Sequence, residues 1–209
     1  MILSLGPDPA GASTSAWALG PPSLVALVAY AGAGWYGERH AERLRTALLV
    51  GWVAQAFAIF VDIAGIGSTV DVARFGFAPA LSMTIWFVIG VYMVESRFVP
   101  LPGVRRALGW LGVVVVALAW AYPGDIRPLA PSRWAPVHWA LGIASYGLFG
   151  AAVLHAAMLN RAERLMRPGR AAIAPGAARG MPLLQLERMT FRYVGAGFVV
   201  LSAALVLGA

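Results

Sequence analysis

The chain has 209 residues, of which 60% are apolar and 12% charged, and its mean hydropathy is +0.74. Soluble domains are nearer 45–50% apolar and about 25% charged, so this composition excludes a compact soluble enzyme and a disordered chain. The formal net charge of +7 comes with sixteen arginines and no lysine. In so apolar a chain, an arginine excess indicates loops held on the cytoplasmic side of a membrane, not nucleic-acid binding. The absence of cysteine excludes disulfides, thiol nucleophiles and covalent c-type haem attachment.

Six stretches are long and apolar enough to cross a membrane, which requires about 20 residues. They cover Ala16–Tyr36, Thr46–Ile66, Phe77–Val94, Ala107–Tyr122, Pro136–Leu159 and Tyr193–Leu207. The first is not expected to be a cleaved signal peptide, because no basic residue precedes it. The sequence therefore predicts an all-α, polytopic membrane helix bundle of about six transmembrane helices, with residues 1–209 forming a single transmembrane domain.

The arginines predict how this bundle is oriented. Thirteen of them follow the first, third and fifth stretches, whereas the other connectors carry only Arg74, Arg127 and Arg133. By the positive-inside rule, the N-terminus and the C-terminus are both predicted to lie outside, on the face opposite the cytoplasm. Residues 161–192 form a basic cytoplasmic loop, in which apolar residues interleaved with charged ones predict an amphipathic segment at the interface.

Polar residues inside a membrane are costly, so each is a functional hypothesis. Gln55, near the middle of the second stretch, favours an interhelical hydrogen bond over substrate contact. Asp62, close to the outer end of that stretch, favours a carboxylate that reaches the headgroups. Ser82 is expected to bond to the backbone of its own helix.

Two histidines lie in the fifth stretch, 17 positions or about 25 Å apart, so they cannot ligate one metal ion together. His155 shares a helical face with small residues, which predicts packing at a helix interface or solvation at the cytoplasmic surface. His138 lies near the outer end. From residue type alone, we favour an interfacial histidine bonded to a loop carbonyl, with an axial ligand of haem iron as the alternative.

Motifs of the common enzyme classes are absent from the sequence. It contains no phosphate-binding Walker loop, no dinucleotide-binding glycine motif, no zinc-protease motif and no nucleophile elbow. We therefore predict no catalytic residues, and a protein that is not itself an enzyme.

Three segments resemble one family of membrane proteins. Ser132–Phe149 contains His138 and then Ser-Tyr-Gly-x-Phe two helical turns later, and Phe75–Trp86 and Leu184–Phe198 match further spans. These segments are similar to cytochrome c assembly proteins of the CcsA/ResC type, which handle haem, and the shorter YpjD-like branch is the most similar.

The resemblance implies a cytochrome c assembly factor that binds or presents haem near the periplasmic face. It implies that His138 is an axial ligand, which is then the only metal ligand, through haem iron. Arg133, Arg127 and Arg74 are candidates to pair with haem propionates. The expected partners are the lipid bilayer, other cytochrome c maturation proteins or a second membrane chain, and no nucleic acid. The alternative is a non-catalytic scaffold or regulator that docks a cytoplasmic partner through its basic loop.

Overall fold

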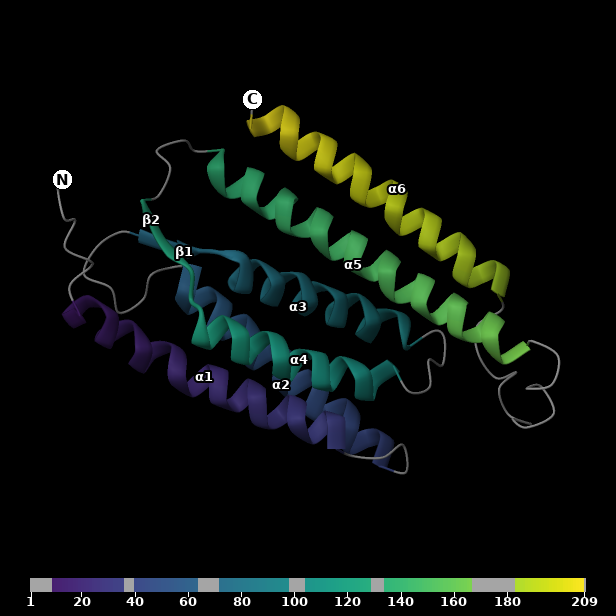
Figure 1. Ribbon diagram of the computed structural model, residues 1–209, viewed down its shortest axis with the longest axis horizontal. Helices are drawn as coiled ribbons and strands as arrows, with labels where there is room; N and C mark the ends of the chain where they lie inside the picture. Colours follow the sequence, from purple (N-terminus) through teal and green to yellow (C-terminus); the bar gives the residue numbers. More distant parts are fainter. Residues whose placement is uncertain are drawn as a thin grey trace. The chain divides into compact units, whose positions relative to one another are not determined.

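The computed structural model describes residues 9–35, 40–63, 72–97, 104–128, 134–166 and 183–208 (Figure 1). Six helices dominate this part of the chain, which confirms the all-α prediction. They are α1 (Pro9–Trp35), α2 (Ala41–Ile63), α3 (Phe77–Glu95), α4 (Val104–Ala121), α5 (Ala135–Met166) and α6 (Leu183–Gly208). Two short strands that the sequence did not predict, β1 (Val72–Phe75) and β2 (Asp125–Pro128), accompany them.

Helices α2 to α6 are each long and apolar enough to cross a membrane, so the protein is a multi-pass membrane protein. Helix α1 covers the first predicted span. Several helices extend beyond the predicted apolar stretches. Among them, α5 continues to Met166, and α6 begins at Leu183 instead of Tyr193. The amphipathic segment is therefore the first part of α6 and not a separate helix.

The contacts within the chain group it into two compact units. Unit 1 consists of residues 1–82 and 109–130, and unit 2 of residues 83–108 and 131–209. Helices α3 and α4 each contribute to both units. The single membrane domain that the sequence predicts would comprise both units.

The core of unit 1 is built around Tyr30 of α1, whose side chain is completely buried. A Cβ atom placed on Gly51 of α2 or on Gly112 of α4 would come within 2.7 Å of the Tyr30 ring. These two glycines therefore let α2 and α4 approach α1 closely, which is how small residues promote helix packing in membranes. Gly109 of α4 meets the α1 backbone itself, with Gly34 N only 2.8 Å from the position of a Cβ.

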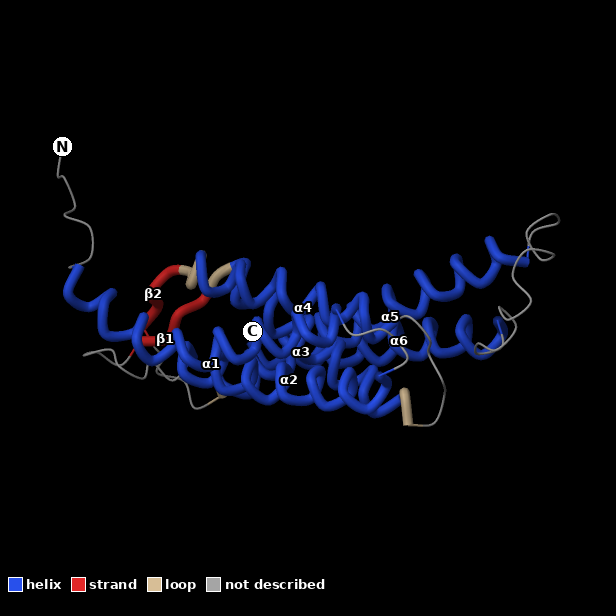
Figure 2. Tube along the Cα trace, turned by 90° about the horizontal axis from the view of Figure 1, so that it is seen from below, coloured by secondary structure: helices blue, strands red, loops and turns tan. Residues whose placement is uncertain are grey.

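The two strands of unit 1 form an antiparallel pair with the register Val72 to Pro128 and Phe75 to Asp125 (Figure 2, red). Gly124 leads from α4 into β2 with a φ of 82°, a conformation that disfavours other residues. A Cβ on Gly76, which leads from β1 into α3, would lie 2.8 Å from Gly124 Cα. Both strand ends therefore depend on glycine.

In unit 2, α5 and α6 lie side by side and antiparallel (Figures 1 and 2). The Ser-Tyr-Gly-x-Phe motif of α5 packs in two directions. Gly147 faces Phe87 of α3, because a Cβ there would overlap the phenyl ring at 2.3 Å, and Phe149 packs on Gly197 of α6. This motif therefore joins three helices of the unit.

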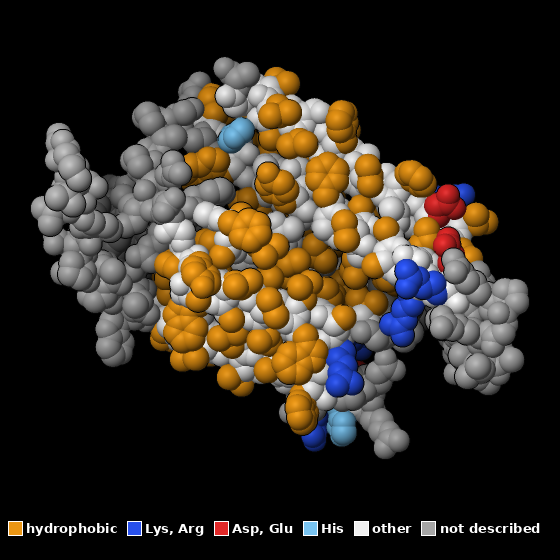
Figure 3. Space-filling view, viewed as in Figure 1, with side chains coloured by type: hydrophobic (Ala, Val, Ile, Leu, Met, Phe, Trp, Pro, Cys, Tyr) orange, Lys and Arg blue, Asp and Glu red, His pale blue; other side chains and the backbone are white. Residues whose placement is uncertain are grey.

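The outer surface is apolar, as expected for helices surrounded by lipid. Hydrophobic side chains cover most of the described surface on the face seen in Figure 3. Large apolar side chains are exposed on both units, including Val28 (73%) on α1 and Val206 (81%) on α6. In unit 2 the described arginines lie where α3 and α5 end and where α4 and α6 begin. These arginines therefore lie at one end of the helices of unit 2, and the assignment of that end to the cytoplasmic face stays a prediction.

We predict that Gly112→Ala destabilises the protein, because the added methyl group meets the Tyr30 ring at 2.7 Å. Overpacking of this kind costs about 1–3 kcal/mol. The free energy of unfolding, measured by SDS titration of the protein in mild detergent, tests this. Gly142→Ala on α5 is the matched control, because no atom lies within 4 Å of its added Cβ. Equal stability of the two variants would contradict this account of the core.

Candidate functional site

His138 lies in the first turn of α5, where its backbone N–H donates to Trp134 O at 3.0 Å. Pro136 lies two residues before His138 in the same turn. Proline is tolerated in a first turn because the N–H groups there have no helical acceptor. The side chain is half-buried, and its neighbour Val137 is 43% exposed. The imidazole is thus at the end of a membrane helix and partly open to its surroundings.

One ring nitrogen of His138 is held by the facing helix. Nδ1 lies 2.9 Å from Ala204 O on α6. Because a carbonyl oxygen only accepts hydrogen bonds, Nδ1 must carry the proton and donate it. The neutral imidazole then has its lone pair on Nε2. A metal-ligating histidine usually shows this arrangement, with the other ring nitrogen donating to a backbone carbonyl or a carboxylate.

Gly208 makes room for this ring. A Cβ on Gly208 would lie 2.6 Å from His138 Cε1 and 2.7 Å from Nδ1. The antiparallel packing of α5 and α6 brings the last turn of α6 to the first turn of α5 (Figure 1). A glycine is needed there because any larger side chain would push the imidazole away from the Ala204 carbonyl. Ala204 and Gly208 of α6 therefore hold the His138 ring in one orientation, which fits a histidine that ligates a metal.

The three arginines predicted to accompany His138 are placed differently. Arg74 pairs with Ile126 and Arg127 pairs with Ala73 in the strand register, so their backbones occupy neighbouring positions of the sheet in unit 1. Arg133 lies outside the described residues. Arg74 and Arg127 belong to unit 1 and His138 belongs to unit 2, and the pairing of the arginines with haem propionates stays a prediction.

His155 is completely buried, which decides between the two interpretations of this residue in favour of a helix interface. Its Nδ1 donates to Ala151 O of its own helix at 2.8 Å, and its Nε2 lies 3.1 Å from Glu95 Oε2 of α3. The second carboxylate oxygen of Glu95 accepts a hydrogen bond from the hydroxyl of Tyr193 on α6. The ring centroids of His155 and Tyr193 are 5.1 Å apart. We call Glu95, His155 and Tyr193 the α3–α5–α6 cluster.

The geometry of the α3–α5–α6 cluster requires a proton between two of its atoms. Nδ1 of His155 already uses its proton to bond Ala151, so Nε2 either has a lone pair or a second proton. Two lone pairs 3.1 Å apart in a water-poor interior would repel one another. Either an imidazolium therefore faces the Glu95 carboxylate, or a carboxylic acid donates to a neutral imidazole. Both nitrogens of His155 are then engaged, and neither can bind iron without breaking the cluster.

Unit 1 contains a second polar network inside its helices. Tyr30 OH donates to Gln55 Oε1 at 2.6 Å, and Gln55 Nε2 donates to Ser82 O and Oγ at 3.0 and 2.9 Å. The interhelical hydrogen bond predicted for Gln55 is confirmed. Ser82, expected to serve only its own helix, accepts from Gln55 because α2 and α3 meet there. Asp62 lies in the last turn of α2, where it is half-buried.

Sequence reasoning did not single out Glu95 and Tyr193. The third predicted span stopped at Val94, one residue short of the carboxylate, and Tyr193 counted only as the start of the sixth span. A signal was present nonetheless. Glu95, His155 and Tyr193 all lie at the ends of spans on the same predicted face of the membrane, where polar side chains can meet.

Comparison with known proteins identifies one family. The sequence model of the family described as Cytochrome C assembly protein matches residues 42–209, about four fifths of the chain. No curated protein and no solved structure matches the chain significantly. The match begins in the first turn of α2 and includes α3 to α6, so it covers the α3–α5–α6 cluster, His138, Gln55 and Ser82 but not Tyr30 of α1.

We predict that His155→Ala destabilises the protein by about 3–5 kcal/mol, because it removes the histidine partner of the Glu95 Oε2 atom in a largely buried position. The double variant with Glu95→Ala should lose about 1–3 kcal/mol less than the sum of the two single variants. Unfolding by SDS titration measures all three variants, and Asn160→Ala, an exposed change on the same helix, is the control. Strictly additive costs would contradict the pairing.

Proposed function

The chain belongs to the cytochrome c assembly protein family, and we propose that it binds haem through His138 and presents it at the periplasmic face of a bacterial inner membrane. The family supports a role in cytochrome c maturation, and the five helices that are long and apolar enough place the protein in a lipid bilayer. The sidedness of the proposal follows from the arginine distribution of the sequence. Other cytochrome c maturation proteins, or a second membrane chain, are the proposed partners.

The observation that supports this proposal best is the hydrogen bond from His138 Nδ1 to Ala204 O. It fixes the tautomer of the imidazole and leaves the Nε2 lone pair for a metal. His138 would hold a haem through Nε2, and the haem would supply the redox chemistry. The residues of this chain supply binding and orientation.

The two histidines of α5 separate these roles. His155 has both ring nitrogens engaged, with Ala151 O and Glu95 Oε2. Of the two ring nitrogens of His138, only Nδ1 has a hydrogen-bond partner among the described residues, Ala204 O. His138 is also half-buried, while His155 is fully buried. This contrast supports His138 as the ligand and His155 as a residue that joins helices. Arg133 is the propionate candidate nearest to His138 in sequence, and Arg127 and Arg74 are the other candidates.

We predict that the purified protein in detergent shows a Soret band after addition of haem, and that His138→Ala abolishes most of this band. His40→Ala is the matched control, because His40 is an exposed residue just before α2 and should leave the spectrum unchanged. An equal Soret band in His138→Ala and the parent protein would exclude His138 as the ligand.

A second variant tests the orientation of the ring. Gly208→Val adds a side chain whose Cβ alone would lie 2.6 Å from His138 Cε1, so it should displace the imidazole from Ala204 O. Loss of such an outer-shell hydrogen bond typically costs 10–100-fold in metal affinity. A haem titration that gives the same dissociation constant for Gly208→Val and the parent protein would show that the ring needs no support from α6.

A further inference from the structure

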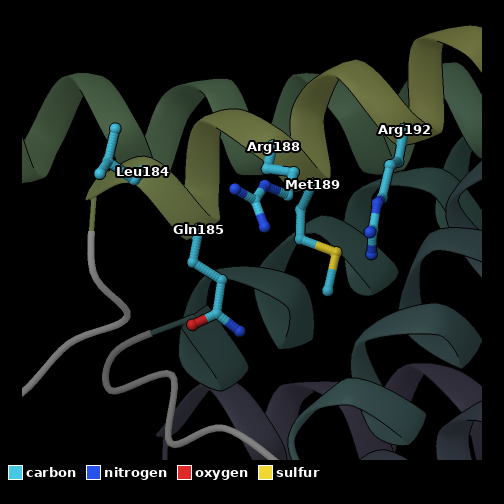
Figure 4. Close-up of a pocket in the computed structure, with 5 residues that line it drawn as sticks. All are labelled: Leu184, Gln185, Arg188, Met189 and Arg192. Carbon is cyan, nitrogen blue, oxygen red and sulfur yellow. The ribbon is translucent and has the colours of Figure 1, made fainter.

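The first part of α6 carries a polar pocket that the haem site does not use. A pocket of about 320 Å³ is lined there by Leu184, Gln185, Arg188, Met189 and Arg192 (Figure 4). Gln185, Arg188, Met189 and Arg192 follow the i, i+3, i+4, i+7 spacing of one helical face. In Figure 4 these four side chains extend to the same side of the α6 ribbon. We call this feature the α6 arginine pocket.

The α6 arginine pocket is positively charged. Arg188 and Arg192 are both exposed, and neither forms an ion pair with a carboxylate in the part of the chain that the structure describes. Glu187 is the one carboxylate between Leu183 and Arg192, and it is exposed as well. The two guanidinium groups, one helical turn apart, are therefore available to a ligand of opposite charge. Guanidinium matches phosphate with paired hydrogen bonds.

The position along α6 indicates where this ligand comes from. The residues from Tyr193 to Gly208 are almost entirely apolar and extend about 24 Å along the helix, close to the thickness of the hydrocarbon core. The pocket residues come before this apolar part and so lie at the depth of the lipid headgroups. Leu184 and Phe191, 76% and 68% exposed, flank the arginines with apolar surface that lipid can cover.

We propose that the α6 arginine pocket binds the phosphate of an anionic phospholipid. Arg188 and Arg192 donate to the phosphate oxygens, the amide of Gln185 donates to the headgroup, and Leu184 and Met189 contact the start of the acyl chains. A phospholipid fits better than an acidic protein because the same short segment offers cationic and apolar surface at headgroup depth. Such a lipid would fix the depth and rotation of α6 in the bilayer.

The test uses the full-length protein in detergent, titrated with phosphatidylglycerol and followed by native mass spectrometry. An arginine that lies next to the anionic headgroup contributes about fivefold in affinity for the lipid. The double variant Arg188→Gln/Arg192→Gln should therefore bind phosphatidylglycerol about 25-fold more weakly. The matched control is Arg161→Gln/Arg164→Gln, which removes the same charge from exposed positions at the end of α5 and should change binding less than threefold.

Four further measurements decide the outcome. Phosphatidylcholine, which has a phosphate but no net charge, should bind weakly to the parent protein and to both double variants. Millimolar inorganic phosphate should not displace phosphatidylglycerol, and full displacement would overturn the assignment to lipid. Equal losses in the two double variants would also overturn it, as would unchanged lipid binding together with lost binding of an acidic protein. His138→Ala should retain lipid binding, so failure of the haem proposal and failure of this one are distinguishable.

Discussion

Polar groups inside a lipid bilayer must form their hydrogen bonds within the protein, because the bilayer core contains no water that could bond to them. In the described part of this chain, that constraint decides which helix faces meet. Gln55 forms hydrogen bonds to α1 and α3, and the α3–α5–α6 cluster connects three helices. His138 donates a hydrogen bond to a carbonyl of α6. Lipid supplies no hydrophobic force that pulls helices together, so these polar contacts and the close packing at glycines specify the arrangement within each unit.

The same constraint separates two residues of identical chemistry. His155 lies where α3 and α6 both reach it, and its hydrogen bonds engage the whole ring. His138 lies at a helix end, where a facing carbonyl holds Nδ1 and the side chain is half-buried. A buried ring with two engaged nitrogens joins helices, whereas a half-buried ring with one engaged nitrogen can bind a ligand. The distinction is set by the neighbouring helices and not by the residue type.

Much of this fold is predictable from the sequence, because apolar length and arginine placement are properties of single segments. The spans and the all-α class follow from apolar length. The interhelical hydrogen bond of Gln55 is predictable because a polar side chain in the middle of a span needs a partner on another helix. The bounds of α5 and α6 are less predictable. Charged residues at the end of an apolar stretch indicate a loop, although the helix continues through the arginines and glutamates there. Glu95 could not be recognised as a partner of His155, because their contact depends on how α3 packs against α5. For His138, sequence alone favoured a bond to a loop carbonyl, and the observed acceptor is a helix carbonyl of α6.

The central claim is that the Ala204 carbonyl fixes the tautomer of His138 and leaves Nε2 with its lone pair. Nitrogen-15 NMR of the haem-free protein, labelled in its histidines and assigned by comparison with His138→Ala, measures this directly. The account predicts one neutral tautomer at His138, with the proton on Nδ1 and none on Nε2. A proton on Nε2, or rapid exchange between the two tautomers, would contradict it.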